Sequence, residues 1–160
     1  MDAELVTCRQ IAIRYIGIAV KSSGRVSEYL LSKGFSEETS ALTVQGLIDD
    51  GYIDDGRVAR RFLRQSSGSH AEGKALLLRR ILAAGVRTEA AQEALEDYDD
   101  KAALEECVRA KILPEYEKAS AAEDFDMYRF TQKALRTLAS RGFSVSQAIE
   151  TLRRTFRDVE

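Results

Sequence analysis

Four arginines on one predicted helix are the residues in this sequence whose types and spacing best suit a chemical task. They recur at three- and four-residue steps, as Arg57, Arg60, Arg61 and Arg64. At about 100° per residue they fall within an arc of about 100°. The opposite side of the same helix is apolar and carries Val58, Ala59, Phe62 and Leu63. Because each guanidinium is a planar fork of donors that fits a carboxylate or a phosphate, the pattern predicts one buried face and one anion-binding face.

A second basic segment follows in the predicted helix from Lys74 to Ala84. Lys74, Arg79 and Arg80 add positive charge to it, and Leu76 lies off its apolar stripe, between the two arginines on the outer face. Two interpretations of Leu76 are open: it packs against a neighbouring repeat, or it is an apolar contact ringed by arginine, as at many interface centres. The predicted binding residues are therefore Arg57, Arg60, Arg61, Arg64, Lys74, Leu76, Arg79 and Arg80.

The remaining reactive side chains do not form a catalytic or metal-binding pattern. Asp54 and Asp55 could be paired carboxylates, but their position immediately before a helix favours capping. His70 stands alone in a polar loop, and Cys8 and Cys107 lack metal-ligand spacing, which predicts ordinary buried thiols. The sequence contains no phosphate-binding loop and no nucleophile elbow. We therefore predict a protein that is not an enzyme, with no catalytic residue, no metal and no cofactor.

Repeated helix stops organise the elements that must position these residues. LSKGFS at 31–36 returns as ASRGFS at 139–144, and a weaker copy, LAAGVRT, lies at 82–88. In each, glycine takes the position just past a helix end, where a left-handed residue is favoured. Gly34, Gly85 and Gly142 are 51 and 57 residues apart, which is close to the periods of helical repeats. The sequence predicts an all-α fold of three tandem three-helix repeats, at 1–54, 55–99 and 100–160.

Several local features follow from this scheme. We expect nine helices, with the first running from about Glu4 to Lys21, and with an interruption near Pro114. The loop 66–73 has no apolar anchor and is predicted to be mobile. Serines or threonines after the stops are expected to cap the next helices, and they are Ser36, Thr88 and Ser144. The aromatic residues beside the stops are assigned to the core, and they are Phe35, Tyr52, Phe62 and Phe143.

Charge is segregated along the 160 residues although the net charge is only −2. Residues 57–87 contain eight lysines and arginines against one acidic residue, and residues 88–126 contain four against thirteen. The basic block coincides with the predicted anion-binding helices. No apolar run reaches the roughly 18 residues that span a bilayer, and the N-terminus is acidic. We expect a cytoplasmic protein with no membrane partner.

The ordered set of motifs resembles the RecX family of recombination regulators. The motifs are LLSKGFSEE, GYIDDGRVARRFL, a helix closing in LAAGV, and KALRTLASRGFSVSQAI, and together they span about residues 11–152. The chain departs from the family pattern at Arg25, Val26 and Ala84, and in the near-neutral loop 66–73. The resemblance implies three stacked repeats in an elongated, curved array and no enzymatic activity.

The resemblance also implies a partner, the RecA recombinase filament. Family members bind RecA on DNA and restrain filament growth, ATP hydrolysis and strand exchange in DNA repair and the SOS response, and they can bind single- or double-stranded DNA. The expected role is thus a regulator that modulates RecA, by inhibition, through the basic second repeat. Whether its arginines meet acidic side chains of RecA or phosphates stays open, because both are anions and both respond to salt. We expect a monomer, since a repeat array needs no partner to fold.

Two other functions remain as alternatives. The helix-stop-helix units could be helix-turn-helix readers of DNA, as in a transcription regulator, with the helix after the turn in the major groove. The helices after the stops begin with Glu37–Glu38, Thr88–Glu89 and Val145–Ser146. The acidic first one is a poor candidate for approaching phosphates, and none of the three has arginine or asparagine in its first turn. A generic helical adaptor that does not bind RecA is the third possibility.

Overall fold

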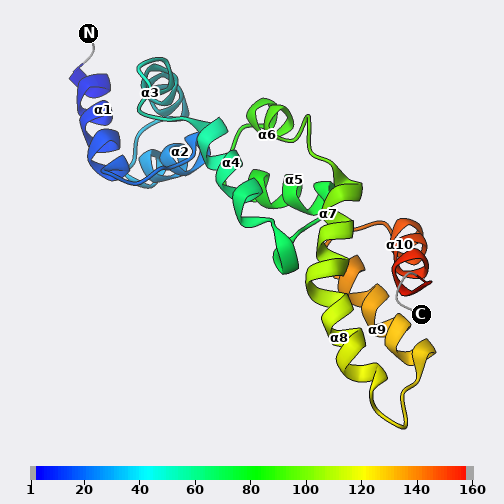
Figure 1. The fold of residues 1–160 in the computed structure, drawn as a ribbon. Coiled ribbons are helices and arrows are strands. Elements are labelled where there is room, and N and C mark those ends of the chain that lie inside the picture. The colour runs from blue at the N-terminus through cyan, green and yellow to red at the C-terminus, as the bar shows by residue number, and fades with distance from the viewer. Residues whose placement is uncertain (1–2, 158–160) are drawn as a thin grey trace. The chain divides into compact units, whose positions relative to one another are not determined.

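The computed structural model describes residues 3–157, and every regular element in that range is helical (Figure 1). The first three helices are α1(Ala3–Ile16), α2(Ser23–Ser32) and α3(Glu37–Asp49). The next are α4(Asp55–Gln65), the 3₁₀ turn η1(Gly68–His70), α5(Lys74–Ala83) and α6(Thr88–Ala94). The last are α7(Asp100–Cys107), the π-helical turn η2(Val108–Ile112), α8(Leu113–Ser120), α9(Met127–Ser140) and α10(Val145–Arg157). The all-α prediction is confirmed.

The predicted helix stops are present in the backbone. Gly34, Gly85 and Gly142 have φ of 91°, 86° and 84°, in the left-handed region that favours glycine. At each stop the N–H of the glycine and of the following residue donate back to the last turn of the helix, the pattern of a Schellman motif. Gly51, with φ of 77°, ends α3 in the same way.

Two predicted helix boundaries are wrong. The first helix ends at Ile16 and not near Lys21, because Gly17 adopts a φ of 54° and stops it. The expected interruption at Pro114 is absent, since α7, η2 and α8 follow one another without a gap. Proline lies in the first turn of α8, directly after the π turn. The wider π turn there accommodates a residue that can donate no backbone hydrogen bond.

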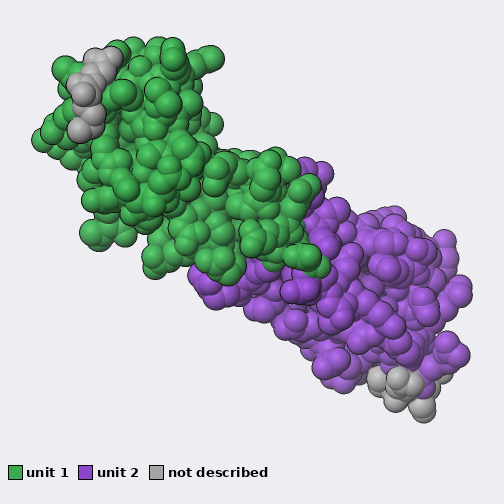
Figure 2. Space-filling view, turned by 90° about the horizontal axis from the view of Figure 1, so that it is seen from above, with its two compact units in different colours: residues 1–61, 80–96 green, residues 62–79, 97–160 purple. Residues whose placement is uncertain are grey.

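The chain forms two compact units (Figure 2). Unit 1 consists of residues 1–61 and 80–96, and unit 2 of residues 62–79 and 97–160. The boundaries cross α4 between Arg61 and Phe62 and α5 between Arg79 and Arg80. The three-repeat division, whose predicted boundaries coincide with the starts of α4 and α7, stays a prediction.

Unit 1 is built around the mutual packing of α1, α2 and α3. Its fully buried side chains include Cys8, Ala12, Val26, Leu30 and Leu47. On α1 and α2 they recur at a four-residue step, which gives each of these helices one buried face. Tyr52 does not join this core. It is half exposed, with the guanidinium of Arg9 5.6 Å from its ring centroid, so its assignment to the core is wrong.

Unit 2 packs α10 against α7 and α9. Its core is made of Leu104, Cys107, Leu138 and Leu152, and an aromatic cluster extends it. In that cluster the ring of Tyr116 lies 4.6 Å from that of Phe156, measured between centroids. Phe143 is buried as predicted. Both cysteines are free and buried, so the prediction of ordinary buried thiols is confirmed.

Candidate interaction surface

Helix α4 begins at a side-chain cap that the sequence predicts. The Asp54 carboxylate accepts a hydrogen bond of 2.9 Å from the backbone N–H of Arg57, and so satisfies one of the free donors of the first turn. Asp54 is also 3.8 Å from the guanidinium of Arg60, with both side chains more than half exposed. This cap sets the residue at which α4 begins, and so the position of each arginine along the helix.

The two predicted faces of α4 are present. Ala59 is fully buried, Val58 is 9% exposed, and Phe62 and Leu63 are half-buried. The exposed side carries the four predicted arginines, Arg57, Arg60, Arg61 and Arg64. Within residues 3–157, only Arg60 of these four has an ion-pair partner. The other three guanidiniums are therefore available to external anions.

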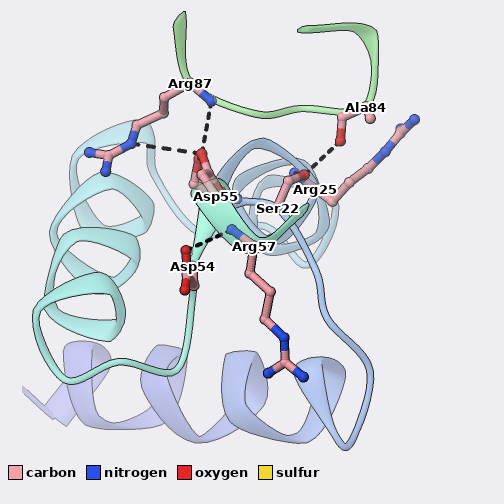
Figure 3. Close-up of polar contacts among 8 residues, drawn as sticks. Ser22, Arg25, Asp54, Asp55, Arg57, Ala84 and Arg87 are labelled. Carbon is pink, nitrogen blue, oxygen red and sulfur yellow. Dashed lines mark hydrogen bonds and ion pairs between the residues drawn. The ribbon is translucent and has the colours of Figure 1, made fainter. Parts of the chain in front are cut away.

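Asp55 does not cap the helix, and its predicted capping role is wrong. It is 4% exposed and links three chain segments of unit 1. One carboxylate oxygen accepts from the N–H of Ser23 at 2.7 Å, and the other accepts from the Ser23 hydroxyl at 2.6 Å and from the N–H of Arg87 at 2.8 Å. The Arg87 guanidinium lies 3.8 Å from the same carboxylate (Figure 3). A buried carboxylate with this set of donors is a structural clasp.

Helix α5 carries the other predicted residues. Lys74, Arg79 and Arg80 are exposed, and the N–H of Lys74 donates to Asp100 at 2.6 Å. Leu76 is half-buried, and a Cβ placed on Gly142 would lie 2.5 Å from its Cβ. This contact with the stop that follows α9 supports the packing interpretation of Leu76.

The predicted site residues are divided between the two compact units. Unit 1 contains Arg57, Arg60, Arg61 and Arg80, and unit 2 contains Arg64, Lys74, Leu76 and Arg79. The sequence prediction left out two further arginines of unit 1, Arg25 and Arg87, which are about half exposed and ion-paired, with Glu28 at 3.0 Å and with Asp55 at 3.8 Å. Arg87 lies in the basic block, directly before α6, and this position could have added it to the predicted set. No basic cluster in the sequence points to Arg25, because its neighbours along the chain are not basic.

The loop between α4 and α5 is anchored, against expectation. Ala71 is fully buried, and Ser66 is 9% exposed. The N–H of Glu72 donates to the Ser66 hydroxyl at 2.9 Å, and the Tyr98 hydroxyl donates to the carbonyl of Glu72 at 2.5 Å and lies 3.2 Å from Ser66 Oγ. Burial raises the pKa of Tyr98 above its ordinary value. The sequence showed no apolar anchor because a single alanine supplies it.

Cys107 and His70 lie in different surroundings, one buried and one exposed. Burial raises the pKa of the Cys107 thiol, which favours the neutral form over the nucleophilic thiolate. His70 is exposed. The part of the chain that the structure describes contains no group of three or more metal-ligand side chains, and no helix in it is long and apolar enough to cross a membrane.

Comparison with known proteins decides the family. None of the protein-family models compared with the chain matches it. A relative from Chlorobium phaeobacteroides, named regulatory protein RecX, is 30% identical over 147 residues, which cover 92% of each protein. The chain belongs to the RecX family. A second RecX, from Prosthecochloris aestuarii, is 30% identical over 142 residues and 88% of each chain. Family membership supports a regulatory role.

Other RecX proteins are longer than this chain. RecX of Lactobacillus johnsonii is 28% identical over 135 residues, so the chain spans about half, 48%, of the length of this relative. The fold is shared with a RecX crystal structure from Lactobacillus salivarius, with a TM-score of 0.74, 21% identity, and coverage of 96% of this chain and 97% of the other. The RecX relatives are named for regulation and not for catalysis.

Two of the helices that follow the stops, α3 and α6, begin with acidic first turns. Ser36 caps α3, accepting from the N–H of Thr39 at 3.0 Å, and the first turn carries Glu37 and Glu38. Thr88, predicted to cap α6, is already its first helical residue, and Arg87 takes the cap position without a side-chain bond. An acidic first turn repels phosphates, so the helix-turn-helix alternative has less support than an arginine surface on α4.

Proposed function

We propose that this RecX family member binds the RecA recombinase filament, as a monomer, and inhibits its recombination and ATPase activity. The proposal places the chain in the control of DNA repair, recombination and the SOS response. Family membership supports a regulatory role, and the resemblance of the motifs supplies RecA as the partner. The observation that carries the site is the exposed arginine face of α4.

The chemistry of that face fits an anionic partner. Val58 and Ala59 are buried on the side of α4 opposite the arginines, so packing holds the helix while its guanidiniums stay in solvent. Arginine binds carboxylates and phosphates through paired N–H donors. A filament offers both, as acidic side chains and as the backbone of its DNA. Either contact weakens as salt rises, since exposed charges are screened.

A RecA ATPase titration tests the proposal. Purified chain is added to RecA on single-stranded DNA, and ATP hydrolysis and filament length are measured together. We expect hydrolysis to fall and filaments to shorten as the chain approaches stoichiometry with RecA. Unchanged hydrolysis and length at stoichiometric excess would reject RecA regulation and favour the adaptor alternative. A gel-shift panel of unrelated naked duplexes separates the DNA-reader alternative, which requires tight and sequence-dependent binding.

A further inference from the structure

The three repeated helix stops are those at Gly34, Gly85 and Gly142. At two of them, Gly85 and Gly142, the start of another helix donates hydrogen bonds to the carbonyls of the stop; we call these two stops occupied. In unit 1, the Gly85 carbonyl accepts from the N–H of Gly24 at 2.8 Å, and the Ala84 carbonyl accepts from the Ser22 hydroxyl at 2.6 Å (the latter bond drawn in Figure 3). Ser22 is the N-cap of α2. The start of α2 is thus seated on the stop that follows α5.

The same arrangement recurs in unit 2. The carbonyl of Arg141 accepts from the N–H of Gly73 at 2.8 Å, and Gly73 directly precedes α5. The start of α5 is thus seated on the stop that follows α9. In both places the first-turn donors of one helix, which have no partner in their own helix, meet carbonyls at the end of another. The partial charges of the two helix ends are opposite, which favours this contact.

Close approach of the two backbones requires glycine on both sides. A Cβ on Gly24 would lie 2.6 Å from the Gly85 carbonyl oxygen, and a Cβ on Gly73 would overlap the carbonyl of Gly142. On the stop side, a Cβ on Gly85 would lie 2.6 Å from Ser22 Oγ, and the Cβ on Gly142 would meet Leu76. The fit is therefore specific for a helix start that carries glycine.

The third stop has the same backbone and no occupant. Lys33, which precedes Gly34, has a φ of −88°, and Arg141, which precedes Gly142, has a φ of −89°. The φ of Gly34 is 91° and that of Gly142 is 84°. A Cβ on Gly34 would have no neighbour within 4 Å, and no group in residues 3–157 donates to the carbonyl of Lys33 or Gly34. Lys33 and Gly34 are both exposed. We call Lys33–Gly34 the vacant stop. Its backbone carbonyls have no donor within residues 3–157, whereas the corresponding carbonyls of the other two stops accept hydrogen bonds from a helix start.

We propose that the vacant stop at Lys33–Gly34 binds the start of an α-helix from the partner filament, a helix with glycine at its N-cap or in its first turn. This inference rests on the proposed function for the identity of the partner. A second copy of this chain is a poor occupant. The other described helix with glycine in its first turn is α4, with Gly56, and its start is held within unit 1 by the buried Asp55. The remaining equivalent helix start, that of α9, reads Asp126, Met127 and Tyr128. It has no glycine, and the Cβ atoms there would collide with the stop as they would at Gly24 and Gly73.

Substitution of Gly34 by asparagine tests the site, with Gly51→Asn as the matched control. Asparagine tolerates the left-handed backbone better than most residues, and its Cβ meets open space at both positions. Both stops are Schellman turns in unit 1, but Gly51 follows α3 and has no counterpart among the occupied stops. We expect Gly34→Asn to weaken filament binding at least about tenfold, the loss produced by excluding a central contact. Gly51→Asn should bind as the wild type does.

The outcomes distinguish this inference from the proposed function. A wild-type chain that fails to bind RecA rejects the function itself. Wild-type binding that both variants retain, or lose equally, overturns the vacant-stop site while leaving RecA binding intact. A photo-crosslinker introduced at Lys33 gives a second measurement. A crosslink to the first turn of a RecA helix supports the site, whereas a crosslink elsewhere on RecA or to another copy of this chain overturns it.

Discussion

Asp55 and Ser23 stand 32 residues apart in the sequence and are joined by two hydrogen bonds, of 2.7 and 2.6 Å, from the N–H and the hydroxyl of the serine to the two oxygens of the carboxylate. The bonds connect the first residue of α4 to the first residue of α2. Asp100, the first residue of α7, makes the corresponding bond to the N–H of Lys74, the first residue of α5. An acidic residue at the start of one helix thus ties down the start of an earlier helix in both units.

Replacing Asp55 by asparagine should destabilise the protein by about 2 kcal/mol, because the amide has one acceptor oxygen where the buried carboxylate has two, and its NH₂ would face donors. Urea denaturation measures the change. Asp54→Asn is the control on the neighbouring residue. Asparagine caps helices as well as aspartate does, so its effect should stay within about 0.5 kcal/mol. Equal effects of the two substitutions would contradict the clasp.

Two glycine-to-alanine substitutions in unit 1 should act in opposite directions. Gly46 lies inside α3, and an added Cβ there makes only an ordinary contact, 3.6 Å from Arg9. Gly46→Ala should raise the free energy of unfolding by about 0.5–1 kcal/mol through helix propensity. Gly24→Ala forces a Cβ against the Gly85 backbone and should lower it by about 1–3 kcal/mol. Thermal denaturation of both variants checks the signs, and a stable Gly24→Ala protein would contradict the close packing at the stop.

The helix stops were predictable because their signals are local. Gly34, Gly85 and Gly142 end their helices with positive φ, and the residues around each glycine indicate the stop in the sequence. The buried and exposed faces of α4 followed from spacing alone. The role of Asp55 did not, since its donors come from Ser23 and Arg87, both distant in sequence. Local rules assign a pair of aspartates before a helix to capping, and they cannot choose between a cap and a long-range clasp.

The candidate site was predictable in composition but not in arrangement. Spacing placed the four arginines of α4 on one face, whereas their division between two compact units depends on which helices pack together. Tyr52 shows the same limit. Its position after a stop suggests the core, but burial is decided by neighbours that sequence does not show. The seating of one helix start on another stop was also hidden, because Gly24 and Gly73 differ in their position relative to the helices they begin.

Alkaline pH should destabilise the protein through Tyr98. Burial, the largest cause, and nearby carboxylates raise the pKa of its hydroxyl above 10.0. The folded chain therefore holds this proton more tightly than the unfolded chain, so the stabilisation is complete below about pH 10 and is lost as pH rises through the folded pKa. Urea denaturation at about pH 8 and about pH 10.5 measures the decrease. Tyr98→Phe lacks the proton and should show a smaller decrease than the wild type. An equal decrease in both would show that Tyr98 is not the group responsible.

Removing the arginine face of α4 should weaken filament binding without unfolding the chain. The variant replaces Arg57, Arg60, Arg61 and Arg64 by alanine. Its helix keeps Val58, Ala59 and the Asp54 cap, so circular dichroism and the melting temperature should change little. Binding to RecA on DNA should fall by about 10- to 100-fold, equivalent to about 1.4–2.8 kcal/mol, and the salt dependence of the remaining binding should be shallower.

The control for that variant must remove the same charge elsewhere. Arg14, Arg109, Arg136 and Arg153 are exposed arginines on α1, η2, α9 and α10, and their joint replacement by alanine lowers the net charge equally. If binding depends on the total charge of the chain, both variants lose affinity to the same extent. If it depends on the face of α4, only the first variant does. Equal losses would therefore move the site away from α4, because a general attraction between charges does not distinguish the helix that carries them.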